Sequence, residues 1–256
     1  MEDIRQRIAR RMLKVSAQFL KYSSAILVVI ANANTVLLKN AVIGLDSYTQ
    51  KSLVAAMDAD AQLTGLVGLA SVIDVLAGLG VPVFAFLLAE GFAHTSNYGE
   101  YLKRVAITAA VSEFAYDFAM TGRILEFSRQ SPMLGVALCL IMLYFMGRTE
   151  EKPLVDRVIL QILLALCGLF WALALRAEYA VAMVLMTAVF YCLRAHRFPR
   201  LAAGLICSIQ YVLGPMAFIA LTFYNGRRQL KCPSAVFYVL YPAHLLVLGI
   251  VGNYIL

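Results

Sequence analysis

Two pairs of ionisable residues at helical spacing are suited to acid–base chemistry. The first pair is Glu90 and His94, which are four residues apart, so a helix that continues through both places a carboxylate and an imidazole on one face. A carboxylate beside a histidine fixes the tautomer of the ring and supports its use as a general base. We therefore interpret His94 as a candidate base and Glu90 as its orienting group.

The second pair, Glu113 and Asp117, has the same spacing. Two carboxylates on one helix face repel each other unless a cation or a shared proton lies between them. Arg104 is about three turns earlier and reaches neither, so we expect a basic residue from another helix near this pair. A purely structural role also stays open, because Asp117 is close to the end of its apolar run.

A third group of polar residues lies toward the C-terminus. Asn225 and the glycine after it have the composition of a tight turn, and Arg227 and Arg228 offer paired guanidinium groups to a phosphate or carboxylate. His244 stands in an apolar stretch, where a histidine is more often satisfied by a carbonyl or hydroxyl than catalytic. It is a second candidate for the site.

Several function classes are excluded by what the sequence lacks. It contains no GxSxG, HExxH or GxxxxGK motif, which argues against a hydrolase, a metalloprotease and an ATPase. The five cysteines form no CxxC pair, so we expect neither a metal site nor a disulfide framework. The net charge of +7 comes from basic residues in short stretches between apolar runs, so we expect no nucleic-acid partner.

Apolar runs must position these groups. Hydrophobic residues make up 62% of the 256-residue chain and charged residues only 14%, which excludes a soluble globular protein. We expect an all-α fold, a polytopic integral membrane helical bundle of about eight transmembrane helices. The eight apolar runs are 22–38, 62–91, 101–119, 132–146, 154–175, 179–193, 201–223 and 235–254. The fourth and sixth runs are short, and Gly78, Gly80 and Pro82 predict a break in the second run.

The distribution of basic residues predicts the orientation. With the N-terminus inside, most of the 22 Lys and Arg residues lie on the inner side, so we expect both termini in the cytoplasm and Arg227 and Arg228 outside. Residues 1–21 place apolar and basic side chains on different faces, which predicts a basic amphipathic interfacial helix ahead of one transmembrane domain, 22–256. A plainer interpretation is a basic anchor that only sets the orientation.

Two stretches of the chain resemble the TraX family of membrane proteins. One is PVFAFLLAEGFAHTSN at 82–97, which is followed by Tyr101 and Arg104. The other combines FYNGRR at 223–228 with LYPAHLL at 240–246. The similar motifs extend from Lys21 to His244, and so cover most of the chain.

The resemblance implies a bacterial inner-membrane acyltransferase that uses cytoplasmic acetyl-CoA and no metal. The acetyl group would pass to an amine or hydroxyl of a membrane-associated acceptor, such as a peptide N-terminus, a glycan or a lipid. Implied partners are membrane lipid, acyl-CoA, the unidentified acceptor and a further membrane protein. The implied site residues are His94 and Glu90 for catalysis, Arg104, Thr95, Asn97 and Tyr101 for the cofactor, and Asn225, Arg227, Arg228, His244 and Asn32 for an acceptor or anion.

The chain departs from the family pattern at several polar positions. Members usually carry an Asp-His pair in the first span, about ten residues after a lysine, and alignment on Lys21 places Ala31 and Asn32 there. Neither of these can act as a general base. The family's usual Arg before its Pro-x-Phe motif falls at Gly78, and its Asp-Tyr-Gly falls at Glu178-Tyr179-Ala180.

These departures leave alternative hypotheses open. Either His94 carries the remaining acid–base chemistry, or the chain is a catalytically degenerate member that acts as a non-enzymatic membrane partner or binding subunit. Asn32 suits the second hypothesis, because an amide can bind an acyl carbonyl without transferring a proton. A channel or transporter is a third hypothesis, supported by Asp74 and by the pair of Glu113 and Asp117.

Overall fold

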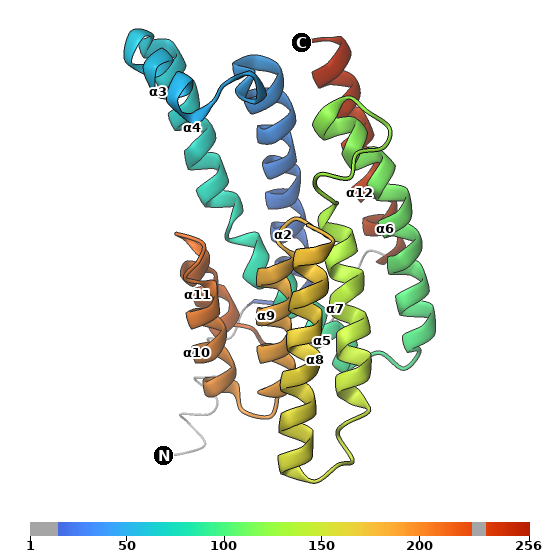
Figure 1. The fold of residues 1–256 in the computed structure, drawn as a ribbon. Coiled ribbons are helices and arrows are strands. Elements are labelled where there is room, and N and C mark those ends of the chain that lie inside the picture. The colour runs from blue at the N-terminus through green and yellow to red at the C-terminus, as the bar shows by residue number, and fades with distance from the viewer. Residues whose placement is uncertain (1–14, 227–233) are drawn as a thin grey trace.

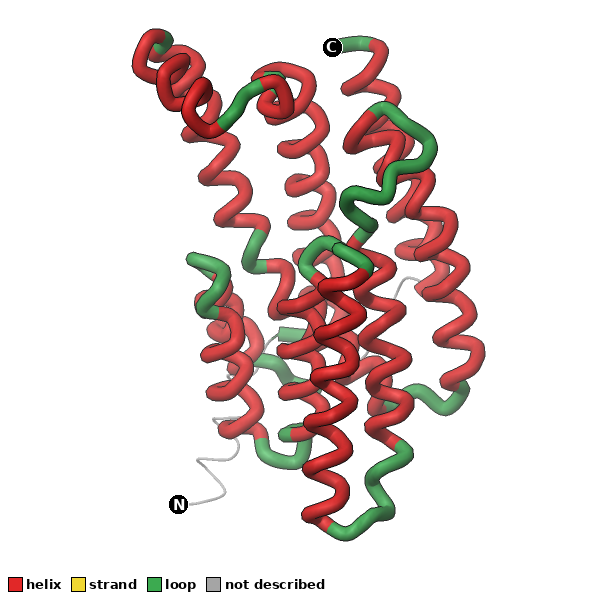
Figure 2. Tube along the Cα trace, viewed as in Figure 1, coloured by secondary structure: helices red, strands yellow, loops and turns green. Residues whose placement is uncertain are grey.

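The computed structural model describes residues 15–226 and 234–256, and within them the fold is a bundle of helices without a strand (Figure 2). The predicted all-α membrane bundle is therefore confirmed. In chain order the elements are α2 (Ala17–Ala33), η1 (Asn34–Ile43), η2 (Leu45–Ser47), α3 (Gln50–Ala59), α4 (Ala61–Ala77), α5 (Gly80–Ala93), α6 (Tyr98–Thr121), α7 (Pro132–Gly147), α8 (Leu154–Ala174), α9 (Ala180–Cys192), α10 (Arg197–Ser208), η3 (Gly214–Met216), α11 (Ala217–Thr222) and α12 (Ser234–Tyr254).

The long helices run side by side between two ends of the bundle (Figure 1). We call the end at which α2 begins, at Ala17, the proximal end, and the end at which η1 finishes, at Ile43, the distal end. Four segments of the described chain are long and apolar enough to cross a membrane: Ala17–Ile43, Ala61–Ala93, Leu154–Ala174 and Val236–Tyr254. Helices α7 and α9 are apolar but shorter, as the sequence predicted for its fourth and sixth runs.

The break predicted in the second run is present. Helix α4 ends at Ala77 and α5 begins at Gly80. This interruption makes Pro82 the third residue of α5, within the first turn, where no backbone N–H is needed for an intrahelical bond. The second run is thus two helices in series, and the lower one, α5, leads directly to His94.

The predicted seventh crossing, 201–223, is wrong. Helix α10 has 12 residues, which gives about 18 Å at 1.5 Å per residue and is too short for a bilayer core of about 30 Å. The chain then turns at residues 209–213 and returns through η3 and α11 to the proximal end. There the Arg197 guanidinium donates to the carbonyl of Thr222. Apolar composition predicted a span correctly only where the helix continues.

This re-entrant hairpin changes the topology downstream. The Asn225 N–H donates to the Val15 carbonyl at 3.0 Å, so Asn225 lies at the proximal end. Helix α12 therefore runs from the proximal to the distal end, and the chain ends at Leu256, opposite the start of α2 (Figure 1). The prediction that the chain enters and leaves the membrane domain on one side does not hold for the described residues, because α2 begins and α12 ends at opposite ends of the bundle. Arg227, Arg228 and most of the predicted interfacial helix at 1–21 lie outside the described residues.

The carboxylates of α6 are held by backbone groups. Glu113 accepts the Ser131 N–H at 3.0 Å, and Asp117 accepts the Glu126 N–H at 2.8 Å. The predicted basic partner is therefore wrong, because the loop 122–131 supplies amide donors instead. In the same loop, the Ser128 N–H donates to the Glu126 carboxylate and lowers the pKa of Glu126 below its usual value.

The hairpin packs closely on the core, and Gly204 makes this approach possible. A Cβ added at Gly204 would lie 2.4 Å from Cε1 of the buried Phe190 and 3.0 Å from Cε1 of Phe218. We expect Gly204→Ala to lower the free energy of unfolding by about 1–3 kcal/mol, because the ring must leave its preferred position. Thermal melting of the detergent-purified variant measures this.

Gly65 provides the matched control, because a Cβ there meets no atom within 4 Å. Gly65→Ala should leave the melting temperature unchanged or slightly raised, since Ala is the better helix former. Equal melting temperatures for Gly204→Ala and the unmodified protein would show that α10 does not approach Phe190 as closely as the structure places it.

Candidate functional site

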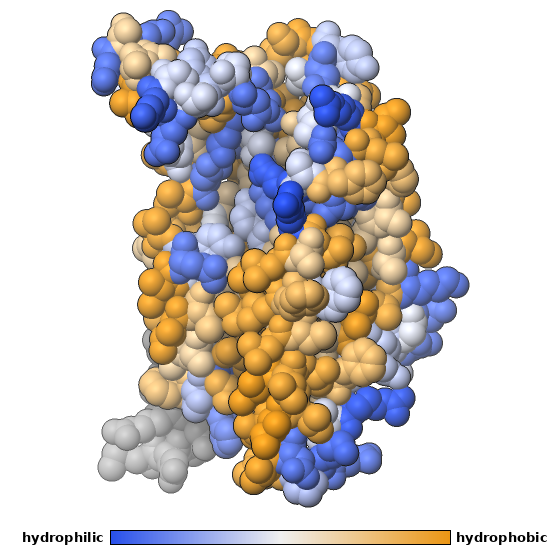
Figure 3. All heavy atoms as spheres, viewed as in Figure 1, coloured by the Kyte–Doolittle hydropathy of each residue, from blue (hydrophilic) through white to orange (hydrophobic). Residues whose placement is uncertain are grey.

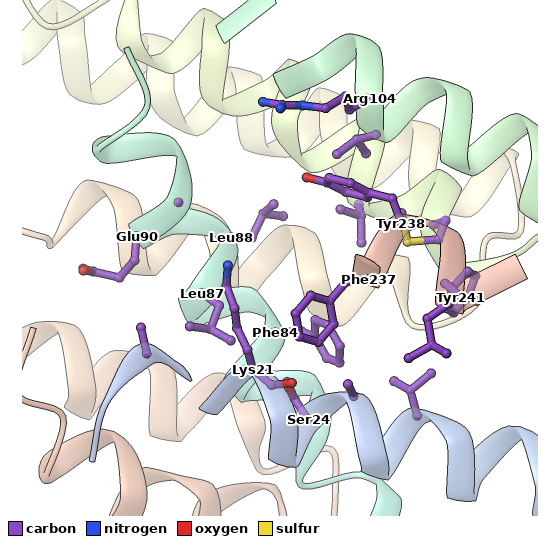
Figure 4. Close-up of a pocket in the computed structure, with 18 of the residues that line it drawn as sticks. Lys21, Ser24, Phe84, Leu87, Leu88, Glu90, Arg104, Phe237, Tyr238 and Tyr241 are labelled. Atoms are coloured by element: carbon purple, nitrogen blue, oxygen red, sulfur yellow. The ribbon is translucent and has the colours of Figure 1, made fainter. Parts of the chain in front are cut away.

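A cavity of about 390 Å³ reaches into the bundle from the proximal end, between α2, α5, α6 and α12 (Figure 4). Most of its wall is apolar, and the side chains of Phe84, Leu87 and Leu88 form the α5 side. The polar residues that line it are Lys21, Ser24, Glu90, His94, Thr95, Tyr101, Arg104, Tyr224, Tyr238, Tyr241 and His244. Ligand sites in proteins commonly combine an apolar wall with a few placed polar groups.

Two cationic side chains approach the cavity from different walls. Lys21 extends from α2 toward its centre, and Arg104 lies across from it on α6, beside Tyr238 (Figure 4). Lys21 is only the fifth residue of α2, where a long side chain can keep its ammonium near the polar end of the bundle. The two positive charges favour an anionic group at the mouth of the cavity. Arg104 was predicted as a binding residue, whereas Lys21 was not.

His94 ends helix α5 at the mouth of this cavity. Its Nδ1 lies 3.0 Å from the backbone carbonyl oxygen of Glu90, which can only accept a hydrogen bond. Nδ1 therefore carries a proton, and in the neutral ring Nε2 has the lone pair that a general base needs. The ring is exposed and lines the cavity, so Nε2 is accessible to a ligand.

The predicted pairing of His94 with the Glu90 carboxylate is wrong. That carboxylate instead forms an ion pair with Arg200 of α10 at 2.7 Å, and it points away from the cavity (Figure 4). The two side chains are only 15% and 11% exposed, and the Arg200 guanidinium also lies 4.5 Å from the centre of the Phe86 ring. Glu90 thus connects α5 to the re-entrant hairpin, and the helix carbonyl orients His94.

The remaining predicted cofactor residues divide into two groups. Thr95 and Tyr101 line the cavity together with Arg104. Asn97 does not line it, because its Oδ1 accepts the Glu100 N–H at 3.1 Å and caps the start of α6. The short loop between α5 and α6 therefore brings three of the four predicted side chains to the mouth.

His244 and Asn32 meet at the inner end of the cavity. The Nδ1 of His244 lies 3.1 Å from the Leu240 carbonyl oxygen, so Nδ1 is the protonated nitrogen. The amide nitrogen of Asn32 lies 2.9 Å from Nε2, so the amide donates to the lone pair of the ring. His244 lines the cavity while the buried Asn32 lies behind it. Because the Asn32 amide occupies Nε2, His94 is better placed than His244 to act as a base.

Of the predicted acceptor residues near position 225, only Asn225 is among the described residues. Asn225 pairs with Val15 through its backbone and does not line the cavity. Its neighbour Tyr224 does, and the Tyr224 ring packs edge-to-face on Phe86 with 5.1 Å between the ring centres. Sequence reasoning missed Tyr224, Tyr238 and Lys21, since only the packing of distant helices shows which of their faces is turned inward.

A second cavity, of about 340 Å³, lies at the distal end and is polar. Asp74 lines it and pairs with Lys39, and Asn34 donates to Asp74 at 2.9 Å. Glu178 accepts the Tyr116 hydroxyl at 2.7 Å. On the face seen in Figure 3, hydrophilic side chains gather in the upper half, toward the distal end. The intramembrane carboxylates that suggested a channel or transporter therefore have partners within the fold.

The proximal cavity combines a cationic mouth, an imidazole whose Nε2 is accessible and an apolar interior. Among the described residues, no three His, Cys, Asp or Glu side chains come together to hold a metal ion. The sequence profile of one family, described as TraX protein, matches residues 16–252, nearly the whole chain. No curated protein and no solved structure matches the chain.

Proposed function

The chain belongs to the TraX family, and on this premise we propose that it is an integral membrane acyltransferase. It transfers an acyl group from acetyl-CoA or a related thioester to an amine or hydroxyl of a membrane-associated acceptor. The observation that carries this proposal is the single cavity mouth shared by Lys21, Arg104 and His94 above an apolar interior. The mouth suits the phosphates and thioester of coenzyme A, and the interior suits the acyl group.

Each group at the mouth has one task in this reaction. Arg104 binds phosphate oxygens through its guanidinium fork. His94 Nε2 removes the proton from the acceptor while the acceptor's nitrogen or oxygen forms a bond to the thioester carbonyl carbon. The Lys21 ammonium stabilises the negative charge that develops on the carbonyl oxygen. The carbon–sulfur bond then breaks, and the coenzyme A thiolate leaves and takes the proton from His94.

The basic residues favour a cytoplasmic proximal end in a bacterial inner membrane. Of the Lys and Arg residues in the described chain, nine lie toward the proximal end and five toward the distal end. The cavity then opens to the compartment that contains acetyl-CoA, and the C-terminus lies on the other side. The nine are Lys21, Lys103, Arg104, Arg148, Lys152, Arg157, Arg194, Arg197 and Arg200, and the five are Lys39, Lys51, Arg123, Arg129 and Arg176.

Lys21→Met tests this function, because it removes the ammonium and keeps the apolar stem. The protein in lipid nanodiscs is incubated with acetyl-CoA and two acceptor probes, a hydrophobic peptide with a free amino terminus and octyl glucoside. Mass spectrometry then measures the acetylated product. We expect the variant to lose about 10²–10³-fold in rate, as when one oxyanion donor is removed.

Lys103→Met is the matched control, because Lys103 is the exposed neighbour of Arg104 and does not line the cavity. It should transfer acetyl groups at the rate of the unmodified protein. If Lys21→Met formed product at that same rate, Lys21 would have no role in the reaction. If the unmodified protein formed no product with either probe, the proposed activity toward these probes would be contradicted.

A second candidate function, a non-enzymatic binding subunit, is favoured by the bond between Asn32 and His244. Asn32 stands where relatives usually carry a first-span histidine, and its amide occupies the nitrogen of His244 that would accept a proton. This alternative predicts that the purified chain binds acetyl-CoA saturably but transfers no acetyl group to any acceptor. The mass-spectrometric assay therefore separates the two functions.

A further inference from the structure

Two contacts between α2 and α12 lie on either side of a stretch in which both helices line the cavity. The two helices run in the same direction, and at the proximal end the Tyr22 and Phe237 rings lie 5.6 Å apart. Deeper in the bundle, Asn32 contacts His244 at 2.9 Å. From Phe237 to His244 the distance along α12 is about 10 Å at 1.5 Å per residue. Between these contacts, residues of both helices line the cavity.

Residues between these contacts are exposed as well as turned toward the cavity. Val29 of α2 and Leu240 of α12 both line the cavity, and they are also 37% and 48% exposed. We call the part of the cavity wall between Val29 and Leu240 the lateral window. Both helices belong to segments long and apolar enough to cross a membrane, so the lateral window faces the hydrocarbon of the bilayer and not water.

The interior between Lys21 and the lateral window is larger than an acetyl group requires. It is lined on the α5 side by Phe84 and Leu87 and on the α7 side by Val136, none of which carries a polar side chain. An acetyl group whose carbonyl lies beside Lys21 offers one methyl to this surface. A longer chain buries one more methylene at each step, and each buried methylene raises affinity about fourfold.

We propose that the cavity binds an acyl chain longer than acetyl, with the thioester beside Lys21 and the far end of the chain passing through the lateral window. This inference rests on the proposed acyltransferase function and names its donor as a medium- or long-chain acyl-CoA. The apolar wall accounts for the chain, Arg104 at the mouth accounts for the phosphates, and the lateral window gives the chain an exit into the bilayer.

The test compares three ligands, octanoyl-CoA, acetyl-CoA and coenzyme A, by equilibrium binding to the protein in nanodiscs. We expect octanoyl-CoA to bind more than tenfold more tightly than acetyl-CoA. Val29→Trp fills the lateral window and should lower the octanoyl-CoA affinity more than the acetyl-CoA affinity, so that the preference for the longer chain falls. Leu240→Trp fills it from the other helix and should act in the same way.

Val72→Trp is the control, because Val72 is 57% exposed on α4 and does not line the cavity. It should preserve the preference for octanoyl-CoA. Equal affinities of the unmodified protein for acetyl-CoA and octanoyl-CoA would overturn the inference and leave the proposed function standing. No binding of any of the three ligands would overturn the proposed function itself.

An anionic phospholipid presents the same combination of charge and chain, so dioctanoyl phosphatidylglycerol is tested as a competitor. The inference expects it to displace octanoyl-CoA only weakly, because it lacks the nucleotide phosphates that reach Arg104. Tighter binding of the phospholipid than of octanoyl-CoA would assign the cavity to membrane lipid and overturn the inference.

Discussion

His94→Ala is expected to lower acyl transfer about 10²–10⁴-fold, the usual contribution of a positioned general base. The expectation follows from the hydrogen bond between His94 Nδ1 and the Glu90 carbonyl, which selects the neutral tautomer with its lone pair on Nε2, at the cavity mouth. Binding of acetyl-CoA should stay within about twofold, because Arg104, which holds the phosphates, is unchanged. Initial rates and equilibrium binding in the same nanodisc preparation separate the two quantities.

His196→Ala is the control for this loss, because His196 is also exposed but lies before α10 and does not line the cavity. It should leave the rate unchanged. A further variant, Glu90→Gln, distinguishes the carbonyl from the carboxylate as the orienting group. If the carbonyl orients His94, the pH dependence of the rate in Glu90→Gln matches that of the unmodified protein. A full rate in His94→Ala would contradict the role of base.

Glu90→Ala is expected to cost about 3–5 kcal/mol in the free energy of unfolding, which is the usual penalty for removing one partner of a buried ion pair. The Arg200 guanidinium, only 11% exposed, would lose the carboxylate that it contacts at 2.7 Å. Thermal melting in detergent measures the effect. The pair connects α5 with α10, so the loss should also expose the hairpin to proteolysis at lower temperature.

Two further variants separate this effect from a general sensitivity to acidic substitutions. Glu151→Ala removes an exposed carboxylate in the loop before α8 and should change the stability by no more than about 0.5 kcal/mol. The double substitution Glu90→Leu with Arg200→Met replaces the ion pair by apolar side chains and should recover most of the stability. A melting temperature of Glu90→Ala equal to that of the unmodified protein would show that the ion pair does not hold the hairpin.

Most of the fold could be predicted because the signal for a membrane helix is local. The runs of apolar residues, the two short runs and the break near Gly78 all follow from composition over a few turns. The hairpin of α10 and α11 could not be predicted in the same way. Residues 201–223 are as apolar as a crossing, and only the turn at residues 209–213 and the contacts of the returning chain give its direction.

The candidate site was predictable where its residues are neighbours in the sequence. His94, Thr95, Tyr101 and Arg104 belong to one loop and the start of the next helix, so a single motif pointed to all of them. The partners of these residues come from distant parts of the chain. Arg200 is 110 positions from Glu90, and no local pattern predicts that pairing.

Two separate corrections alter the predicted chemistry. The backbone carbonyl of Glu90, not its carboxylate, orients His94. The Glu90 carboxylate has a structural role instead, in the ion pair with Arg200. The Asn32 amide engages His244, so the inner histidine is not free to accept a proton at Nε2. Both corrections depend on which atom of each side chain faces which partner, and residue spacing alone does not specify this.

The central claim is tested most directly by the binding of acetyl-CoA to the protein in nanodiscs. Isothermal titration measures this binding for the unmodified protein and for the variants Arg104→Ala and Lys103→Ala. The two substitutions remove the same charge from adjacent positions, but only Arg104 lines the cavity. We predict saturable binding that Arg104→Ala weakens at least tenfold, about 1.4 kcal/mol, and that Lys103→Ala leaves unchanged. No saturable binding, or the same weakening by both substitutions, would contradict the assignment of this cavity to the acyl donor.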